Sequence, residues 1–75
     1  MYAYILIRTD MGKVMDVLSA IKAMPEVKSA HATIGPYDII AFVEFADPAS
    51  LTSLIVDKIQ KIAGISRTLT CIASE

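Results

Sequence analysis

An internal repeat is the feature of this chain that most constrains its fold. Residues 21–27 align with residues 59–65 at an offset of 38 residues, and the same offset places residues 3–5 on residues 41–43 without a gap. In each copy, an apolar strand-like run precedes a stretch with helical spacing and a second strand-like run. The chain is therefore predicted to contain two β-α-β units.

Two such units with right-handed crossovers interleave into one sheet, in the order β-α-β-β-α-β. The expected fold class is α+β and ferredoxin-like, with a four-stranded antiparallel sheet and two helices on one face. The first and third strands are expected at the centre, and the second and fourth at opposite edges. Residues 1–75 are expected to form one domain. The strands are predicted over Tyr2–Arg8, Glu26–Ile34, Asp38–Ala46 and Ile65–Ala73.

Capping residues and apolar spacing mark the two helices. Aspartate and threonine are strong N-caps, proline suits the first helical position, and glycine often ends a helix in a left-handed conformation. The first helix is predicted to begin at a cap and to carry an apolar stripe at helical spacing until a proline closes it. The residues that mark these boundaries are Thr9 or Asp10, Met11 and Pro25 for the first helix, and Asp47, Pro48 and Gly64 for the second.

Both faces of the two central strands are apolar. Side chains alternate along a strand, so the helices can cover only one of the two sets. Of the 75 residues, 55% are hydrophobic. The chain has a single cysteine, so an intramolecular disulfide cannot stabilise its small core. A sheet-to-sheet dimer is expected to bury the set Tyr2, Tyr4, Leu6, Ile40 and Phe42, while Ala3, Ile5, Ile7, Ile39, Ala41, Val43 and Phe45 face the helices.

Charge and composition disfavour several classes of function. The net charge is −1 and the basic residues are scattered, which disfavours direct DNA binding. The apolar N-terminal run lacks a basic n-region, and no apolar run approaches the roughly 18 residues of a transmembrane helix. No signal peptide or membrane contact is expected, and the cytoplasm is the expected compartment.

Signatures of catalysis and metal binding are also missing. The chain has no Gly-x-Gly-x-x-Gly, Walker-type, Gly-x-Ser-x-Gly or His-Glu-x-x-His motif. One histidine and one cysteine cannot form a closed zinc site. Cys71 is interpreted as a small buried or half-buried strand residue, and His31 as an exposed or interfacial residue on an edge strand. No catalytic residue, metal or cofactor is therefore expected.

The segment of residues 33–38 carries the densest polar chemistry. Gly35 permits backbone conformations closed to other residues and lets a ligand approach the amides, although Pro36 has no N–H. Tyr37 offers a ring and a hydroxyl, and Asp38 a carboxylate able to meet an ammonium group. The same residues fit an ordinary turn with Tyr37 packed on the sheet edge, and on the residues alone that interpretation is preferred.

A family resemblance favours the ligand-binding interpretation of this segment over the ordinary turn. From Ala3 to Ile72 the chain resembles the effector-binding domain of the Lrp/AsnC (feast/famine) regulators, also called the RAM domain. The Gly-x-Tyr-Asp signature at residues 35–38 is the specific part. The other matching segments are Ala-Tyr-Ile-Leu-Ile (3–7), Met-Pro-Glu-Val-Lys (24–28), Thr-Ile-Gly-Pro-Tyr-Asp-Ile-Ile-Ala (33–41) and Ile-Ala-Gly-Ile-Ser-Arg-Thr-Leu-Thr (62–70).

The resemblance implies a non-enzymatic, amino-acid-sensing module whose homodimers join into larger rings, commonly octamers, with effectors bound between dimers. By position, Gly35 and Tyr37 would shape the effector loop, and Asp38 would order it or pair with the effector ammonium. Thr68 and Thr70 would add hydroxyl groups. The usual family member has an N-terminal helix-turn-helix, and this chain begins at the first strand. It therefore resembles the stand-alone type, which would act alone or in mixed assemblies with full-length relatives.

Two other classes of function remain as alternatives. A small dimeric ferredoxin-like enzyme, of the monooxygenase or isomerase type, would share the sheet-to-sheet dimer. The helix-facing residues of the central strands include no titratable group, which speaks against a buried acid–base site. An ACT-like regulatory domain would share the topology and the class of effector but lacks the Gly-x-Tyr-Asp loop.

Overall fold

The order of the elements and the topology of the sheet agree with the repeat. A computed structural model describes residues 1–74. The strands form one antiparallel sheet in the order β2-β3-β1-β4, which confirms the predicted central and edge strands. The elements are β1 (Tyr2–Thr9), α1 (Val14–Lys22), β2 (Val27–Ala32), β3 (Ile39–Glu44), α2 (Pro48–Ser53), the π-helical segment η1 (Leu54–Lys58), the 3-10 segment η2 (Ile59–Lys61) and β4 (Ile65–Ile72).

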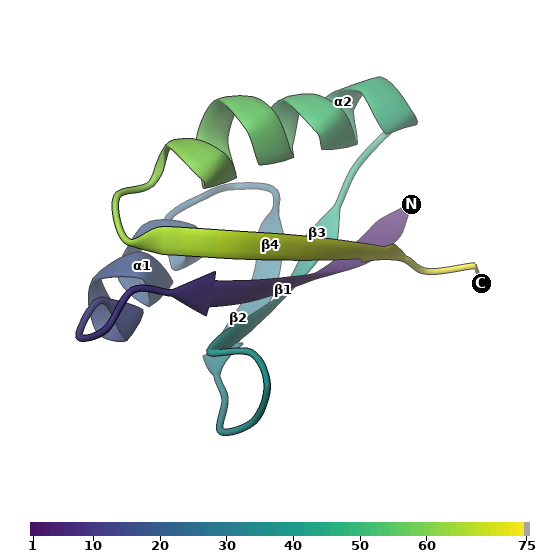
Figure 1. Ribbon diagram of the computed structural model, residues 1–75. Helices are drawn as coiled ribbons and strands as arrows, with labels where there is room; N and C mark the ends of the chain where they lie inside the picture. Colours follow the sequence, from purple (N-terminus) through teal and green to yellow (C-terminus); the bar gives the residue numbers. More distant parts are fainter. Residues whose placement is uncertain (75) are drawn as a thin grey trace.

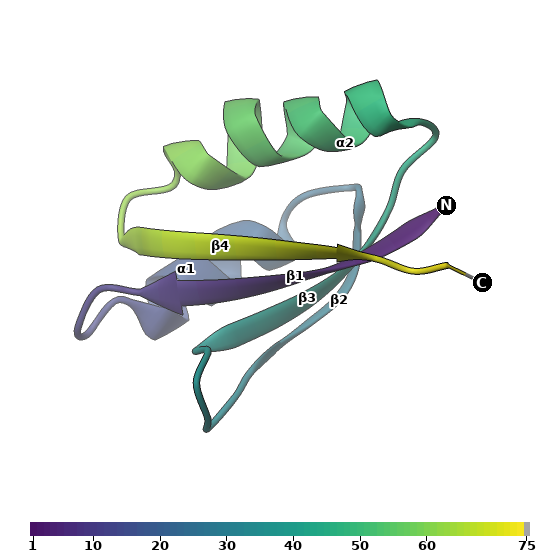
Figure 2. The ribbon, with the colours of Figure 1, turned by 45° about the vertical axis from the view of Figure 1, so that its right-hand side comes forward.

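The helices cover one face of the sheet and form the core with it. Figures 1 and 2 show α2 and its continuation lying above β4, and α1 behind the strands. Alternate residues of the central strands are fully buried on this side. Among them, Ile5 pairs with Ala41 and Ile7 pairs with Ile39 across β1 and β3. The predicted helix-facing set is confirmed in full. The helical residues that form the core with this set are Val17, Leu18, Ile21, Leu51, Leu54 and Ile59.

The first helix begins later than predicted and without a side-chain cap. α1 follows a turn at residues 11–12, and its N-cap residue Lys13 makes no side-chain capping bond. The predicted cap at Thr9 or Asp10 is wrong because α1 starts only at Val14, with Lys13 as its N-cap. Thr9 ends β1, and the Asp10 N–H donates to the Gly64 carbonyl at 2.7 Å. The backbone therefore continues from the strand into a turn before the helix starts.

The second helix begins as predicted, but its last helical segment ends at Lys61 with Ile62 as the C-cap, so Gly64 is not the cap residue. Asp47 is its N-cap and accepts a hydrogen bond from the Ser50 N–H at 2.8 Å, while the Asp47 N–H donates back to the Ser50 hydroxyl at 3.1 Å. This reciprocal capping box satisfies donors that a helix start leaves unpaired. Pro48 is the first helical residue, and Gly64 follows the helical segments with a left-handed φ of 100°.

The interior of the second helix differs from a regular α-helix. The Ile59 N–H reaches the Leu54 carbonyl, an i to i−5 bond, and a short 3-10 turn follows. A π turn contains more residues than an α-helical turn, so it brings residues five apart closer to the same face than an α-helix does. Leu54 and Ile59 are five residues apart and both are buried. The wider turn therefore keeps both side chains in the core.

The strand ends also differ slightly from the predicted ranges. β1 is one residue longer than predicted, because Thr9 still pairs with Ile65 after a shift of register at Arg8. β2 and β3 are each shorter at both ends, and β4 stops at Ile72. The residues lost from β2 and β3 at one end belong to the loop of residues 33–38.

The opposite face of the sheet is open and aromatic. Phe42 lies between Tyr2 and Tyr4, with ring centroids 5.1 Å and 5.0 Å away. Tyr4 remains 47% exposed, although it is flanked by Phe42 and Cys71 on the neighbouring strands. The predicted burial of Cys71 is wrong, since it is exposed on this open face. Leu69, which is 48% exposed, extends the apolar surface onto β4.

Candidate functional site

The loop of residues 33–38 is closed by its first residue. The Thr33 N–H donates to the Asp38 carbonyl at 2.8 Å, and the Thr33 hydroxyl donates to the Tyr37 carbonyl at 2.7 Å. The loop joins β2 to β3 and projects from the lower end of the sheet in Figure 1. Ile34, Gly35 and Pro36 are exposed at its tip, and Tyr37 is half-buried. Two bonds at the base thus hold a loop whose tip is open.

Asp38 joins this loop to the first strand. Its N–H donates to the Ile7 carbonyl at 2.9 Å. Its carboxylate Oδ2 accepts the Thr9 N–H at 2.8 Å and the Thr9 hydroxyl at 3.3 Å. Sequence reasoning missed Thr9, because it lies 29 residues from Asp38 and was assigned to a helix cap. The predicted register of two antiparallel central strands could have indicated that the end of β1 meets the start of β3.

Gly35 does not need the conformational freedom of glycine. The left-handed glycines among residues 1–74 are Gly12 and Gly64, and Gly35 is not one of them. A Cβ atom built on Gly35 would meet no heavy atom within 4 Å. The expected unusual backbone is therefore absent, and the space around Gly35 is open.

Thr68 and Thr70 lie on another strand, away from the loop. They are half-buried residues of β4 and pair with Ile7 and Ile5, so they share the helix-covered side of the sheet. The Gln60 Nε2 atom donates to the Thr68 hydroxyl at 3.4 Å. β1 lies between β4 and β3, which separates the threonines from Asp38 by about 10 Å across the sheet. Within one chain, the five predicted site residues do not form one cluster.

His31 and Cys71 do not form a catalytic pair. His31 is exposed on β2 and Cys71 is exposed on β4, at opposite edges of the sheet. The predicted exposed position of His31 is confirmed. Over residues 1–74, no three His, Cys, Asp or Glu side chains come together as a metal-binding group. None of the helices in that range has the length and apolar character to cross a bilayer.

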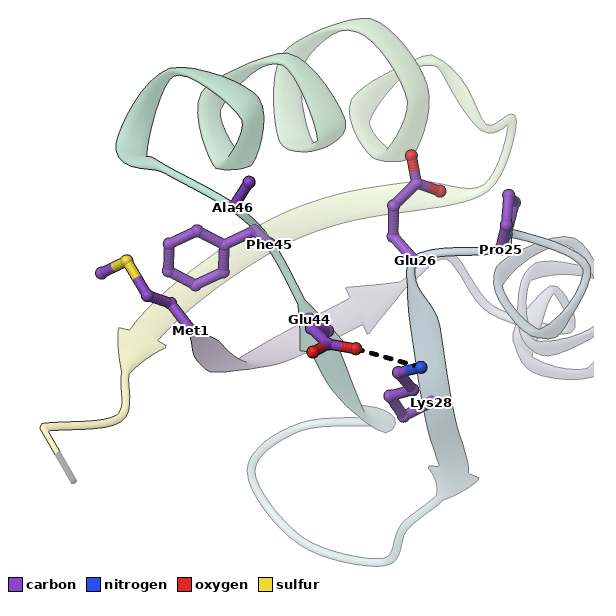
Figure 3. Close-up of a pocket in the computed structure, with 7 residues that line it drawn as sticks. All are labelled: Met1, Pro25, Glu26, Lys28, Glu44, Phe45 and Ala46. Atoms are coloured by element: carbon purple, nitrogen blue, oxygen red, sulfur yellow. Dashed lines mark ion pairs between the residues drawn. The ribbon is translucent and has the colours of Figure 1, made fainter.

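A hollow lies at the other end of the sheet. It measures about 510 Å³, and Figure 3 shows its lining, with the ring of Phe45 on one side and the carboxylate of Glu26 on the other. Lys28 Nζ lies 3.0 Å from Glu44 Oε1, and Lys58 Nζ lies 2.7 Å from Glu26 Oε2. The charged side chains of this hollow are thus already paired, and it includes no predicted site residue.

These ion pairs also determine the ionisation of the two glutamates. The hydrogen bond from Lys58 holds the pKa of Glu26 below its usual range, with a further contribution from the backbone N–H of Glu26 itself. The hydrogen bond from Lys28 likewise lowers the pKa of Glu44. Both pairs join neighbouring elements at the edge of the fold, and both are partly exposed to solvent. They are best explained as structural ion pairs.

Comparison with known proteins identifies relatives along nearly the whole chain. The family model of the Lrp/AsnC ligand binding domain matches residues 2–75. The HTH-type transcriptional regulator FL11 of Pyrococcus horikoshii is 31% identical over 72 residues, which are 96% of this chain and 47% of that protein. The chain thus spans about half the length of the curated relatives it matches.

Solved structures share the fold closely. The crystal structure of FFRP-DM1 is 42% identical, covers 96% of both chains and has a TM-score of 0.92. A transcriptional regulator of Neisseria meningitidis in complex with L-Met is 17% identical and covers 99% of this chain and 49% of its own, with a TM-score of 0.90. At that identity it shows the fold alone. The family match and the shared fold together place this chain in the Lrp/AsnC ligand binding domain family.

Proposed function

We propose that this chain is a sensing domain of transcription regulation that binds a small metabolite, an amino acid, between copies of itself. The observation that carries the proposal is the loop of residues 33–38, which is closed at its base and open at Gly35. Backbone amides presented by a fixed turn suit the carboxylate of an amino acid. The L-Met bound to the Neisseria regulator supports amino acids as the class of effector.

A second copy of the chain would complete the site. Within one chain, β1 lies between the loop and the strand that carries Thr68 and Thr70, so the two parts do not face each other across a shared pocket. They would meet on one effector where one chain supplies the loop and another supplies the threonines. We therefore place Gly35, Tyr37 and Asp38 on one side of the effector and the Thr68 and Thr70 hydroxyls on the other.

The open face of the sheet supports the assembly that this site requires. Tyr2, Tyr4 and Phe42 form a continuous aromatic cluster on it, and a soluble monomer rarely exposes a large apolar patch. A second sheet packed on this face would bury the rings in an isologous dimer. Such dimers would join through their loop ends into a ring, for which we propose an octamer.

The proposed role involves no catalysis and no cofactor. The relatives named HTH-type transcriptional regulators suggest how effector binding would influence DNA binding. Mixed assemblies with such full-length regulators would connect effector binding here to their DNA-reading domains. Direct DNA binding by residues 1–74 is disfavoured by the scattered basic residues.

A screen of the twenty amino acids by thermal shift and calorimetry tests the proposal. Stabilisation by one or a few amino acids is expected, because a ligand that binds only the folded state raises its stability. Gly35→Val should abolish the shift, since its side chain covers the open amides. Ala46→Val, beside the hollow at the other end of the sheet, is the matched control and should bind normally. If no amino acid stabilises the wild-type protein, the proposed function is wrong.

A further inference from the structure

Asp38 has nearly all of its hydrogen-bonding groups engaged inside the chain. Its N–H bonds to Ile7, its carbonyl accepts from Thr33, and its carboxylate Oδ2 accepts two donors from Thr9. The residue is only half-buried, so burial alone does not explain this arrangement. Three segments that are distant in sequence, the end of β1, the end of β2 and the start of β3, meet on one side chain and its backbone.

The position of Thr9 explains why a side-chain acceptor is needed there. The pairing of β1 with β3 ends at Ile7 and Ile39, two residues before Thr9. On its other side, the pairing of β1 with β4 shifts register between Arg8 and Thr9, a β-bulge that disrupts the ladder locally. The backbone of β3 therefore offers the Thr9 N–H no regular partner. The Asp38 carboxylate accepts this N–H where a backbone carbonyl of β3 would otherwise do so, and the contact between β1 and β3 thus continues for one more bond.

We propose that Thr9 and Asp38 form a brace that holds the loop of residues 33–38 in its binding conformation, and that Asp38 serves the effector site as a positioning residue instead of a counter-ion for the effector ammonium. This inference rests on the proposed function. Thr33 closes the loop on itself, and only the brace ties the Asp38 side chain to the first strand. A loop that is already ordered loses less conformational entropy when a ligand binds, which raises affinity without a new contact.

The substitutions Asp38→Asn and Asp38→Ala separate the two roles. The side-chain oxygen of asparagine can accept both Thr9 donors, so Asp38→Asn keeps the brace and removes the charge. Asp38→Ala removes both. For a brace, calorimetry with the amino acid found in the screen should show affinity within about threefold of wild type for Asp38→Asn and at least about tenfold weaker for Asp38→Ala. Asp16→Asn and Asp16→Ala, on the exposed face of α1, are the matched controls and should leave affinity unchanged.

Amide hydrogen exchange gives a second readout that needs no effector. The Thr9 N–H should be protected in the wild type and in Asp38→Asn, and should exchange faster in Asp38→Ala while amides of the core strands stay protected. This measurement decides whether the brace exists even if no amino acid binds, and so separates failure of the brace from failure of the proposed function.

Two results would overturn the inference. If Asp38→Asn loses as much affinity as Asp38→Ala while the Thr9 amide remains protected, the charge itself contacts the effector. If Asp38→Ala exposes the Thr9 amide without weakening binding, the brace does not support the site. Thr9→Ser, which keeps both donors, should behave as wild type in both measurements.

Discussion

Gly64 connects the two halves of the repeat, and replacing it tests how tightly they pack. It has a left-handed φ of 100°, and its carbonyl accepts the Asp10 N–H at 2.7 Å. A Cβ atom at this position would lie 2.9 Å from Lys13 Cβ and 3.1 Å from Val17 Cγ2. Gly64→Ala therefore introduces backbone strain and a steric overlap with the start of α1 at the same time.

Gly12 is the matched control for the backbone part of this effect. It also has a left-handed φ, of 80°, but a Cβ atom there would meet nothing within 4 Å. An L-residue in this region costs about 1–2 kcal/mol, which is the whole expected effect of Gly12→Ala. Overpacking adds about 1–3 kcal/mol, so Gly64→Ala is expected to cost about 2–5 kcal/mol in total. Each kcal/mol lowers the Tm of a domain of this size by about 4–8 °C.

Urea unfolding followed by circular dichroism measures both variants, at one protein concentration because assembly would raise the apparent stability. Lys13→Gly removes the closest atom that Gly64→Ala would overlap and leaves the contact with Val17, and glycine is acceptable at this N-cap position. The double variant should therefore be more stable than the sum of the two single effects predicts. If Gly64→Ala costs no more than Gly12→Ala, the crowding argument is refuted.

Three further predictions concern the sheet face, an ion pair and a helix cap. Tyr4→Glu, which places a charge beside Phe42 on the open face, should give a smaller particle in light scattering than wild type or the exposed-site control Lys61→Glu; an unchanged assembly contradicts the sheet-to-sheet dimer. Glu26→Gln removes the ion pair with Lys58 and should cost less than about 1 kcal/mol at pH 7, because the pair is partly exposed. The pKa of Glu26 is lowered in the folded state, so this stabilisation is present above the pKa of the unfolded chain and is lost as the pH falls through the pKa of the folded chain. A difference in stability between wild type and Glu26→Gln that persists in acid contradicts the ion-pair explanation. Asp47→Ala should cost about 1 kcal/mol of unfolding free energy in denaturant titration, whereas an effect near zero would mean that the capping box is not stabilising.

The parts of the fold that were predictable depend on neighbouring residues or on strict alternation. The buried set of the central strands follows from a period of two, and Asp47 caps the helix that begins at the next residue. The cap of the first helix was mispredicted because the groups of Thr9 bond to a residue 29 positions away. Local spacing likewise could not show the π turn, since burial of Leu54 and Ile59 depends on the sheet beneath them.

The candidate site was predictable as a segment but not as an arrangement. The signature from Gly35 to Asp38 does form a closed loop with an open tip. Its glycine has no left-handed backbone, and its aspartate is held by Thr9, which no local pattern indicated. Thr68 and Thr70 lie across β1 from the loop, a separation that follows from strand order and concerns contacts between chains.

The positions of the tyrosines make this protein its own spectroscopic probe. The chain has three tyrosines and no tryptophan, so its ultraviolet emission comes from tyrosine alone. Tyr2 and Tyr4 lie on the open face of the sheet, and Tyr37 lies in the loop. Emission that changes on dilution would report the uncovering of the face, and emission that changes when an amino acid is added at constant concentration would report the loop. Tyr37→Phe assigns the second signal, and no dye or tag is needed to follow assembly and binding separately.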